Sequence, residues 1–77
     1  MPPQRQGYRK IAADLRERIY AGEYPPGSAL PSYAQLRAIY SVSVTTVQAA
    51  LRELRNWGLI TGEPGVGVFV VDPLPDR

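Results

Sequence analysis

The strongest constraint on the fold is the spacing of the apolar residues, which changes once along the chain. Up to residue 57 these residues recur at steps of three and four in three short stretches, and after Gly58 they form two short runs. The first spacing is typical of amphipathic helices, and the second pattern indicates β-strands. The sequence therefore predicts three helices followed by a hairpin.

The first helix is expected to begin at Tyr8 and to end before Gly22, because glycine accepts the left-handed conformation at a helix end. Asp14 and Arg18, four residues apart, add a stabilising pair on its outer face. The expected inner stripe comprises Tyr8, Ile11, Ala12, Leu15 and Ile19. Residues 1–7 contain two Pro, two Gln and a Gly, so we expect them to form a mobile N-terminal arm.

Two further helices follow a proline-rich turn and a short extended piece at 28–30. Ser32 and Gln35 have the spacing of a capping box, which predicts a second helix that ends near Tyr40. We expect Leu36, Ile39 and Tyr40 to face inward. A third helix, capped by Ser43, spans 43–57. Its apolar stripe is Val47, Leu51 and Leu54, and Trp57 is expected in the core or at a domain boundary.

The last part of the chain predicts a hairpin of two strands, 59–61 and 68–71, joined by a glycine turn. Gly65 and Gly67 supply the positive φ that a tight hairpin requires. Pro73 and Pro75 prevent further strand pairing, so 72–77 is expected to be a tail. The predicted fold class is α+β, mainly α. It is a winged helix-turn-helix of three helices plus a C-terminal two-stranded wing, in one domain at 8–71.

Composition excludes several classes of function. The 77 residues include no Cys and no His, which removes disulfides, thiolate metal sites and the commonest general base. The carboxylates are scattered, so we expect no enzyme, no metal, no cofactor and no small-molecule site within this chain. No apolar run approaches the roughly 20 residues of a membrane helix, and no secretory signal is visible, which predicts a cytoplasmic protein. The net charge of +2 permits a nucleic-acid partner and fits a plain solvated surface equally well.

The order of these motifs is similar to that of one known family. The motifs are a first helix with Tyr8, Ile11, Ala12, Leu15 and Ile19; Gly22 to Gly27 followed by Leu30, Pro31 and Ser32; Val42, Ser43, Thr45, Thr46 and Val47 with Ala50, Leu51 and Leu54; Gly58, Leu59 and Ile60; and Gly65, Gly67, Phe69 and Val70. Together they resemble the winged helix-turn-helix DNA-binding domain of the GntR family of bacterial transcription regulators, over about residues 8–71.

This resemblance implies a repressor-like module that binds a double-stranded DNA operator as a homodimer. Helix 43–57 would enter the major groove, and the wing at 62–68 would reach the minor groove. The family usually adds a C-terminal domain that binds a metabolite. The DNA-binding residues it implies here are Ser32, Tyr33, Ser43, Val44, Thr45, Thr46, Gln48, Arg52, Gly65, Val66 and Gly67.

The chain departs from the family where Arg or another basic or polar residue is common. Those positions hold Ala34, Val44, Gln48, Glu63 and Val66. Arg is the usual reader of guanine, whereas Gln pairs with adenine and an apolar side chain contacts the thymine methyl group. We therefore expect weaker binding than in relatives and A·T pairs at the positions read by Gln48 and Val44.

Some readings stay open on the sequence alone. The lost arginines allow a second function, a winged-helix domain that binds a protein, although the compact polar groups of Thr45, Thr46 and Gln48 suit DNA better. Arg52 and Arg55 either contact phosphate or are plain surface residues. The basic residues Arg5, Arg9 and Lys10 follow the DNA backbone or have no role. Tyr24, Tyr33 and Tyr40 each have a hydroxyl that can donate to phosphate. The chain has little spare apolar surface, which predicts a monomer that pairs only on DNA or through further sequence.

Overall fold

The first helix, α1, spans Tyr8–Tyr20 and buries the stripe expected for it. Its buried residues are Ile11, Ala12, Leu15 and Ile19, while Tyr8 packs half-buried at the edge. Gly22 follows the helix with a φ of +91°, which confirms the predicted stop. These features come from a computed structural model, which describes residues 7–63 and 67–76. The arm at 1–6 lies outside the described residues.

Helices α2 (Tyr33–Tyr40) and α3 (Val44–Asn56) form the predicted helix-turn-helix. The capping box is present: the Ser32 hydroxyl accepts from the Gln35 N–H at 3.2 Å, and the Gln35 side-chain oxygen accepts from the Ser32 N–H at 2.9 Å. Between the helices Ser41 adopts φ 56° and ψ 49°, a left-handed conformation that turns the chain sharply. Such a conformation costs a non-glycine residue about 1–2 kcal/mol, so the tight connection is under local strain.

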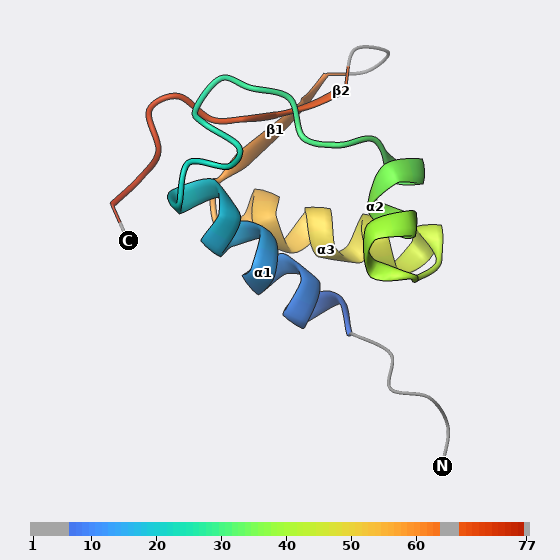
Figure 1. Cartoon of the computed structure of the whole chain (residues 1–77). Helices are drawn as coiled ribbons and strands as arrows, with labels where there is room; N and C mark the ends of the chain where they lie inside the picture. The colour runs from blue at the N-terminus through green and yellow to red at the C-terminus, as the bar shows by residue number, and fades with distance from the viewer. Residues whose placement is uncertain (1–6, 64–66, 77) are drawn as a thin grey trace.

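The hairpin consists of β1 (Ile60–Glu63) and β2 (Gly67–Val70), paired antiparallel with Ile60 opposite Val70 and Gly62 opposite Val68. Figure 1 shows the two strands on one side of the helices. Each strand begins and ends within two residues of the predicted bounds. The predicted extended piece at 28–30 is confirmed, because Ala29 forms an isolated bridge with Phe69 and the Leu30 N–H donates to the Val68 carbonyl at 2.9 Å.

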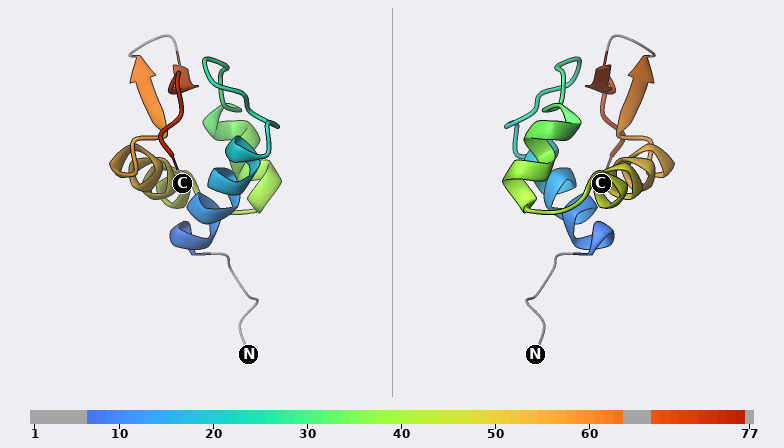
Figure 2. Two further views of the ribbon diagram at one scale, coloured as in Figure 1. Left: turned by 90° about the vertical axis from the view of Figure 1, so that its left-hand side faces the viewer. Right: turned by 90° about the vertical axis from the view of Figure 1, so that its right-hand side faces the viewer.

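All of these elements share one hydrophobic core. Every helix contributes to it, as do the segment before α2 and both strands; the largest fully buried side chains are Ile11, Leu15, Ile19, Leu36, Val47, Leu54, Leu59 and Val70. The two views in Figure 2 show the hairpin extending from the C-terminal end of α3, beside the segment that leads into α2. The predicted class is confirmed: over the described residues the fold is mainly helical, with three helices and a two-stranded wing.

The prediction for Ile39 is wrong, and the structure excludes the core for Trp57. Ile39 was expected to face inward, but it is 51% exposed, because the short helix α2 turns Leu36 into the core and Tyr40 toward Asp14 of α1 instead. Trp57, expected in the core or at a domain boundary, is the C-cap of α3 and remains 36% exposed, so the domain-boundary alternative stays a prediction. The Arg16 guanidinium covers one face of its ring, with Cζ 4.7 Å from the ring centroid. This cation–π contact covers part of an aromatic ring that the core does not enclose.

The chain after β2 returns to the helices. The Val71 N–H donates to the Leu59 carbonyl at 3.0 Å, and the Tyr20 hydroxyl donates to the Pro75 carbonyl at 2.6 Å. Leu74 packs against the edge of the core. The expected tail therefore lies along the end of α1, and the domain bounds of 8–71 stay a prediction.

Candidate nucleic-acid interface

The N-terminal turn of α3 is open to solvent and has no acidic side chain. Ser43 caps the turn: its Oγ accepts from the Thr46 N–H at 3.4 Å and lies 3.3 Å from Thr46 Oγ1. The remaining N–H groups of the first turn and the positive end of the helix dipole favour an anion at this point. The hydroxyls of Ser43 and Thr46 are thus engaged in the cap, and Thr45 presents the exposed hydroxyl beside it.

One exposed stripe runs along the outer face of α3. Val44, Gln48 and Arg52 follow one another at steps of four, and all three are exposed. Val44 is 40% exposed, so an apolar residue lies beside the polar Thr45 and Gln48 on this surface. In order, the stripe offers methyl groups, an amide with a donor and an acceptor, and a guanidinium. These groups can contact a thymine methyl, an adenine edge and a phosphate.

The start of α2 carries the other helical residues of the predicted site. Ser32 is exposed, but its hydroxyl accepts the capping hydrogen bond described above. Tyr33 is the first residue of α2 and is 42% exposed. Because Tyr33 is exposed, its hydroxyl can donate a hydrogen bond to a ligand, whereas the Ser32 hydroxyl is engaged in fixing the helix start.

The wing brings a bare backbone to the surface. Gly67 pairs with Glu63 at the end of the ladder and has a φ of +135°, which confirms the positive φ expected for it. A side chain is strained in that conformation, so glycine is required there. Gly65 and Val66, the other predicted wing residues, lie outside the described residues. The DNA-binding roles of all eleven predicted site residues stay a prediction.

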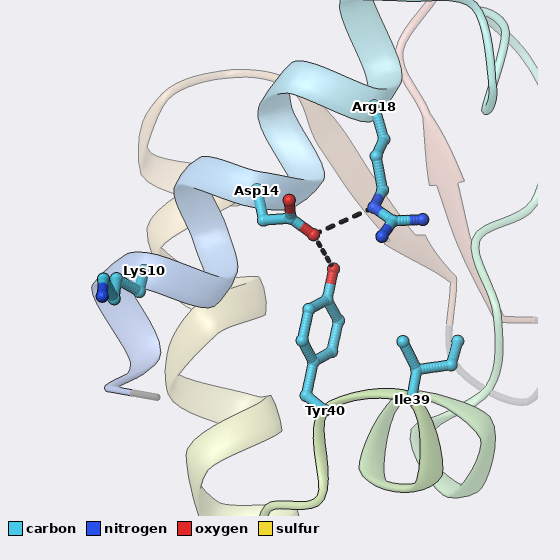
Figure 3. A pocket seen from close by; sticks show the side chains of 5 residues that line it. All are labelled: Lys10, Asp14, Arg18, Ile39 and Tyr40. Carbon is cyan, nitrogen blue, oxygen red and sulfur yellow. Dashed lines mark hydrogen bonds and ion pairs between the residues drawn. The ribbon is translucent and has the colours of Figure 1, made fainter. Parts of the chain in front are cut away.

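A polar pocket of about 370 Å³ between α1 and α2 has a structural explanation. Figure 3 shows Asp14 at its centre, where its Oδ2 accepts a 2.5 Å hydrogen bond from the Tyr40 hydroxyl and a 2.9 Å bond from Arg18 Nε. Arg18 also donates to Glu23 at 2.8 Å, beyond the end of α1. The Tyr40 hydroxyl is therefore committed to Asp14, and the idea that it donates to phosphate is not supported.

The ionisation of this network follows from its contacts. The hydrogen bond from Tyr40, with Arg18 beside it, holds the pKa of Asp14 below its ordinary value. Glu23 and Asp14 raise the pKa of Arg18, so this guanidinium stays charged. Burial and the neighbouring Asp14 raise the pKa of Tyr40, which keeps its proton on the hydroxyl. The network therefore links α1 to α2 through one ionised carboxylate.

Sequence reasoning found part of this arrangement and missed the rest. The spacing of Asp14 and Arg18 predicted their contact, now seen as an ion pair at 2.9 Å. No local pattern connects Asp14 with Tyr40, which is 26 residues away. The stacking of Arg16 on Trp57 also depends on the packing of α1 against the end of α3, and has no signal in the sequence.

Across residues 7–63 and 67–76, no group of three or more acidic, His or Cys side chains could hold a metal ion. Within the same ranges, no helix has the length and apolar character needed to cross a membrane.

Comparison with known proteins gives consistent results. The family model described as "Bacterial regulatory proteins, gntR family" matches residues 7–70. The chain is 39% identical over 66 residues to the histidine utilization repressor of Klebsiella aerogenes, covering 86% of this chain and 27% of that protein. It is 41% identical over 63 residues to the mannosyl-D-glycerate transport/metabolism system repressor MngR of Escherichia coli (strain K12), covering 82% of this chain and 26% of that protein.

A solved structure shares the fold at similar coverage. The crystal structure of AraR(DBD) in complex with operator ORX1 superposes with a TM-score of 0.80 at 27% identity, covering 92% of this chain and 82% of that one. The chain thus spans about a quarter of the length of the two curated relatives and most of the AraR fragment. Because the family model matches nearly the whole described structure, the chain belongs to the GntR family of bacterial regulatory proteins.

Proposed function

We propose that this chain is the part of a bacterial transcription regulator that binds double-stranded DNA sequence-specifically. Helix α3 enters the major groove, and the wing at 62–68 lies in the adjacent minor groove. The observation that carries the proposal is the exposed stripe of α3, in which Val44, Gln48 and Arg52 stand beside an acid-free helix start.

Within this arrangement the predicted site residues divide by chemistry. Gln48 and Val44 read base edges, because the amide matches adenine and the methyl groups match thymine. Thr45, Tyr33 and Arg52 contact the phosphate backbone, and the cap formed by Ser43 and Thr46 presents the first-turn N–H groups to it. Ser32 positions Tyr33. Gly65, Val66 and Gly67 let the wing backbone approach the minor groove closely.

The relatives extend the proposal to the whole regulator. Both curated relatives are named as repressors, and AraR(DBD) was solved with an operator. We therefore propose repression rather than activation, with two copies on one operator, each reading a half-site. Because the DNA of a bacterium lies in its cytoplasm, we propose that the protein acts there. No contact among residues 7–63 and 67–76 favours the alternative of a protein-binding domain.

The experiment is a binding titration on a duplex selected from a random DNA pool and on a scrambled duplex of equal length. Replacing Gln48 by Ala removes the adenine-reading amide. We expect it to weaken binding to the selected duplex by about 1–3 kcal/mol and to leave the scrambled duplex nearly unchanged. Asn56→Ala, which removes an exposed amide at the end of the same helix, is the matched control.

Each outcome bears on the proposal. Loss of discrimination in Gln48→Ala alone supports α3 as the reading helix. Equal weakening on both duplexes would show that Gln48 is not a base reader and that the proposed recognition surface is wrong. Failure of the unaltered chain to bind any duplex at low salt would overturn the DNA-binding proposal itself.

A further inference from the structure

The wing lies within a long stretch of sequence that has no basic side chain. Residues 56–76 include no Lys and no Arg, although this stretch holds both strands and the turn between them. A wing beside DNA lies close to phosphates, and cations are the side chains that usually contact them. A cation that contacts phosphate next to the wing would therefore come from an element outside this stretch.

Arg55, in the last turn of α3, lies directly against β1. A Cβ atom at Gly62 would stand only 2.6 Å from Arg55 Nη2 and 3.6 Å from Cζ. Gly62 is two residues after the buried Ile60, so both positions face the same side of the strand, toward α3. The guanidinium thus occupies the space that a side chain at Gly62 would take.

The charge of Arg55 is available to a ligand. Arg55 is exposed, and the ion pairs found in the described part of the chain are Arg16–Glu17, Arg18–Asp14 and Arg18–Glu23, none of which includes it. The backbone beside Gly62 restricts where the guanidinium can lie, without neutralising it. Such restriction lowers the entropy that Arg loses when it binds.

Arg55 lies on the same face of α3 as the exposed stripe that the proposed function places against DNA. At 3.6 residues per turn, positions 44, 48, 52 and 55 fall within about 80° of one another around the α3 axis. Of these four residues Arg55 is nearest the wing in sequence, since Gly58 and β1 come soon after it. A strand of DNA that crosses from the major-groove helix to the minor-groove wing passes this position.

We infer that Arg55, held against Gly62, binds the DNA phosphate that lies between the recognition helix and the wing. The inference rests on the proposed function and adds a phosphate-binding residue to it. Gly62 acts as a positioning residue, because the absence of its side chain leaves room for the guanidinium. The interaction is with the backbone of DNA, so it contributes to binding of any sequence.

The test compares two variants that each remove one positive charge, Arg55→Gln and Arg16→Gln. Arg16 is a matched control because it stacks on Trp57, which is two residues beyond Arg55 and so points about 200° around the helix from it. Affinity is measured on the selected and the scrambled duplex over a range of salt, for a chain expected to show a log–log slope of about −2 to −4. Circular dichroism confirms that each variant is folded.

We expect Arg55→Gln to weaken binding to both duplexes and to reduce the salt slope by about 0.9. As salt rises from about 50 to about 200 mM, the ratio of unaltered to variant affinity should shrink by about 3.5-fold. Arg16→Gln should leave the slope unchanged. Equal slopes for the two variants would overturn the inference while DNA binding by the unaltered chain still stands, so the two failures are distinguishable.

A second variant, Gly62→Ala, moves the guanidinium without removing its charge. The atom it meets is the far end of a flexible side chain, so Arg55 can shift and the strand can keep its pairing. We expect Gly62→Ala to weaken DNA binding in the presence of Arg55 and to have no further effect in the Arg55→Gln background. An effect that persists unchanged in that background would show that the glycine acts on its own and that it does not position Arg55.

Discussion

Replacing Tyr40 by Phe tests the link between α1 and α2. The substitution removes only the hydroxyl that donates to Asp14 Oδ2 at 2.5 Å, and it leaves the ring packed against the core. The bond joins residues 26 apart in sequence and fixes how α2 sits on α1. Because α2 precedes α3 by a short turn, this contact also supports the angle at which the helix-turn-helix presents α3.

The size of the effect follows from the solvent exposure of the pair. A hydrogen bond to a charged group contributes about 1.5–3 kcal/mol when it is well buried. Here the Asp14 side chain is 45% exposed and keeps its 2.9 Å contact with Arg18, so the carboxylate is not left without a partner. We therefore expect Tyr40→Phe to lower the free energy of unfolding by about 1 kcal/mol at neutral pH, which for a domain of this size lowers Tm by about 4–8 °C.

The loss should depend on pH in a defined direction. The pKa of Asp14 is lowered in the folded chain, chiefly by the Tyr40 hydroxyl, so its stabilising contribution is present above the ordinary carboxyl pKa of about 3.9. That contribution disappears as pH falls through the folded-state pKa. In Tyr40→Phe the pKa of Asp14 is lowered less, so the variant loses less stability as the pH falls. The difference in stability between the two proteins should therefore narrow from about pH 5 to about pH 2.

Urea unfolding followed by circular dichroism at several pH values measures this difference. Tyr33→Phe, which removes an exposed hydroxyl at the other end of α2, should change the free energy of unfolding by less than about 0.5 kcal/mol. A Tyr40→Phe variant as stable as the unaltered chain at neutral pH would refute the reasoning. So would a deficit that stays constant down to about pH 2, because the bond would then not depend on an ionised carboxylate.

Three further predictions concern the turn, the reading stripe and the oligomeric state. Ser41→Gly should raise the free energy of unfolding by about 0.5–1 kcal/mol, because glycine relieves the left-handed strain at that residue, and thermal unfolding measures it. Val44→Arg should strengthen binding to every duplex and shift preference toward guanine, as measured by titration and by renewed selection from a random pool. The free chain should sediment as a monomer at micromolar concentration, since few of the residues that the structure describes are large, apolar and exposed; a tight dimer in the absence of DNA would contradict this.

The fold could be predicted well because its signals are local. Each element is indicated by residues close to it in sequence: the apolar stripes of the helices, the Ser32–Gln35 capping box, the cap Ser43 and the stop Gly58. Every element lies close to its expected bounds. The errors concern side chains whose burial depends on distant partners. Ile39 and Tyr40 both have the spacing of core residues, but only Tyr40 packs against the core, where it bonds to Asp14, a contact that no local pattern reveals.

The sequence predicts which face of α3 is exposed, but it does not predict which side chains on that surface are free to bind a ligand. The exposed face of α3 follows from helical periodicity once the buried Val47, Leu51 and Leu54 are assigned. Which hydroxyls remain free does not follow, because Ser43 and Ser32 are engaged in caps and Tyr40 is bonded to a carboxylate. A residue type shows what a group can bind, and only the packing shows whether it is already occupied.

Gly62 shows why a contact can be hidden from sequence reasoning. Glycine inside a strand weakens it by about 0.5–1 kcal/mol relative to Ala, and it often marks a close approach by another group. Here that group is the Arg55 guanidinium, which can shift when a methyl group is added. If the approach serves DNA binding, Gly62→Ala should leave the hairpin as stable or stabilise it slightly while DNA affinity falls. A substitution that moves stability and affinity in opposite directions is expected of a functional glycine, because a glycine kept only for the fold would lose both together.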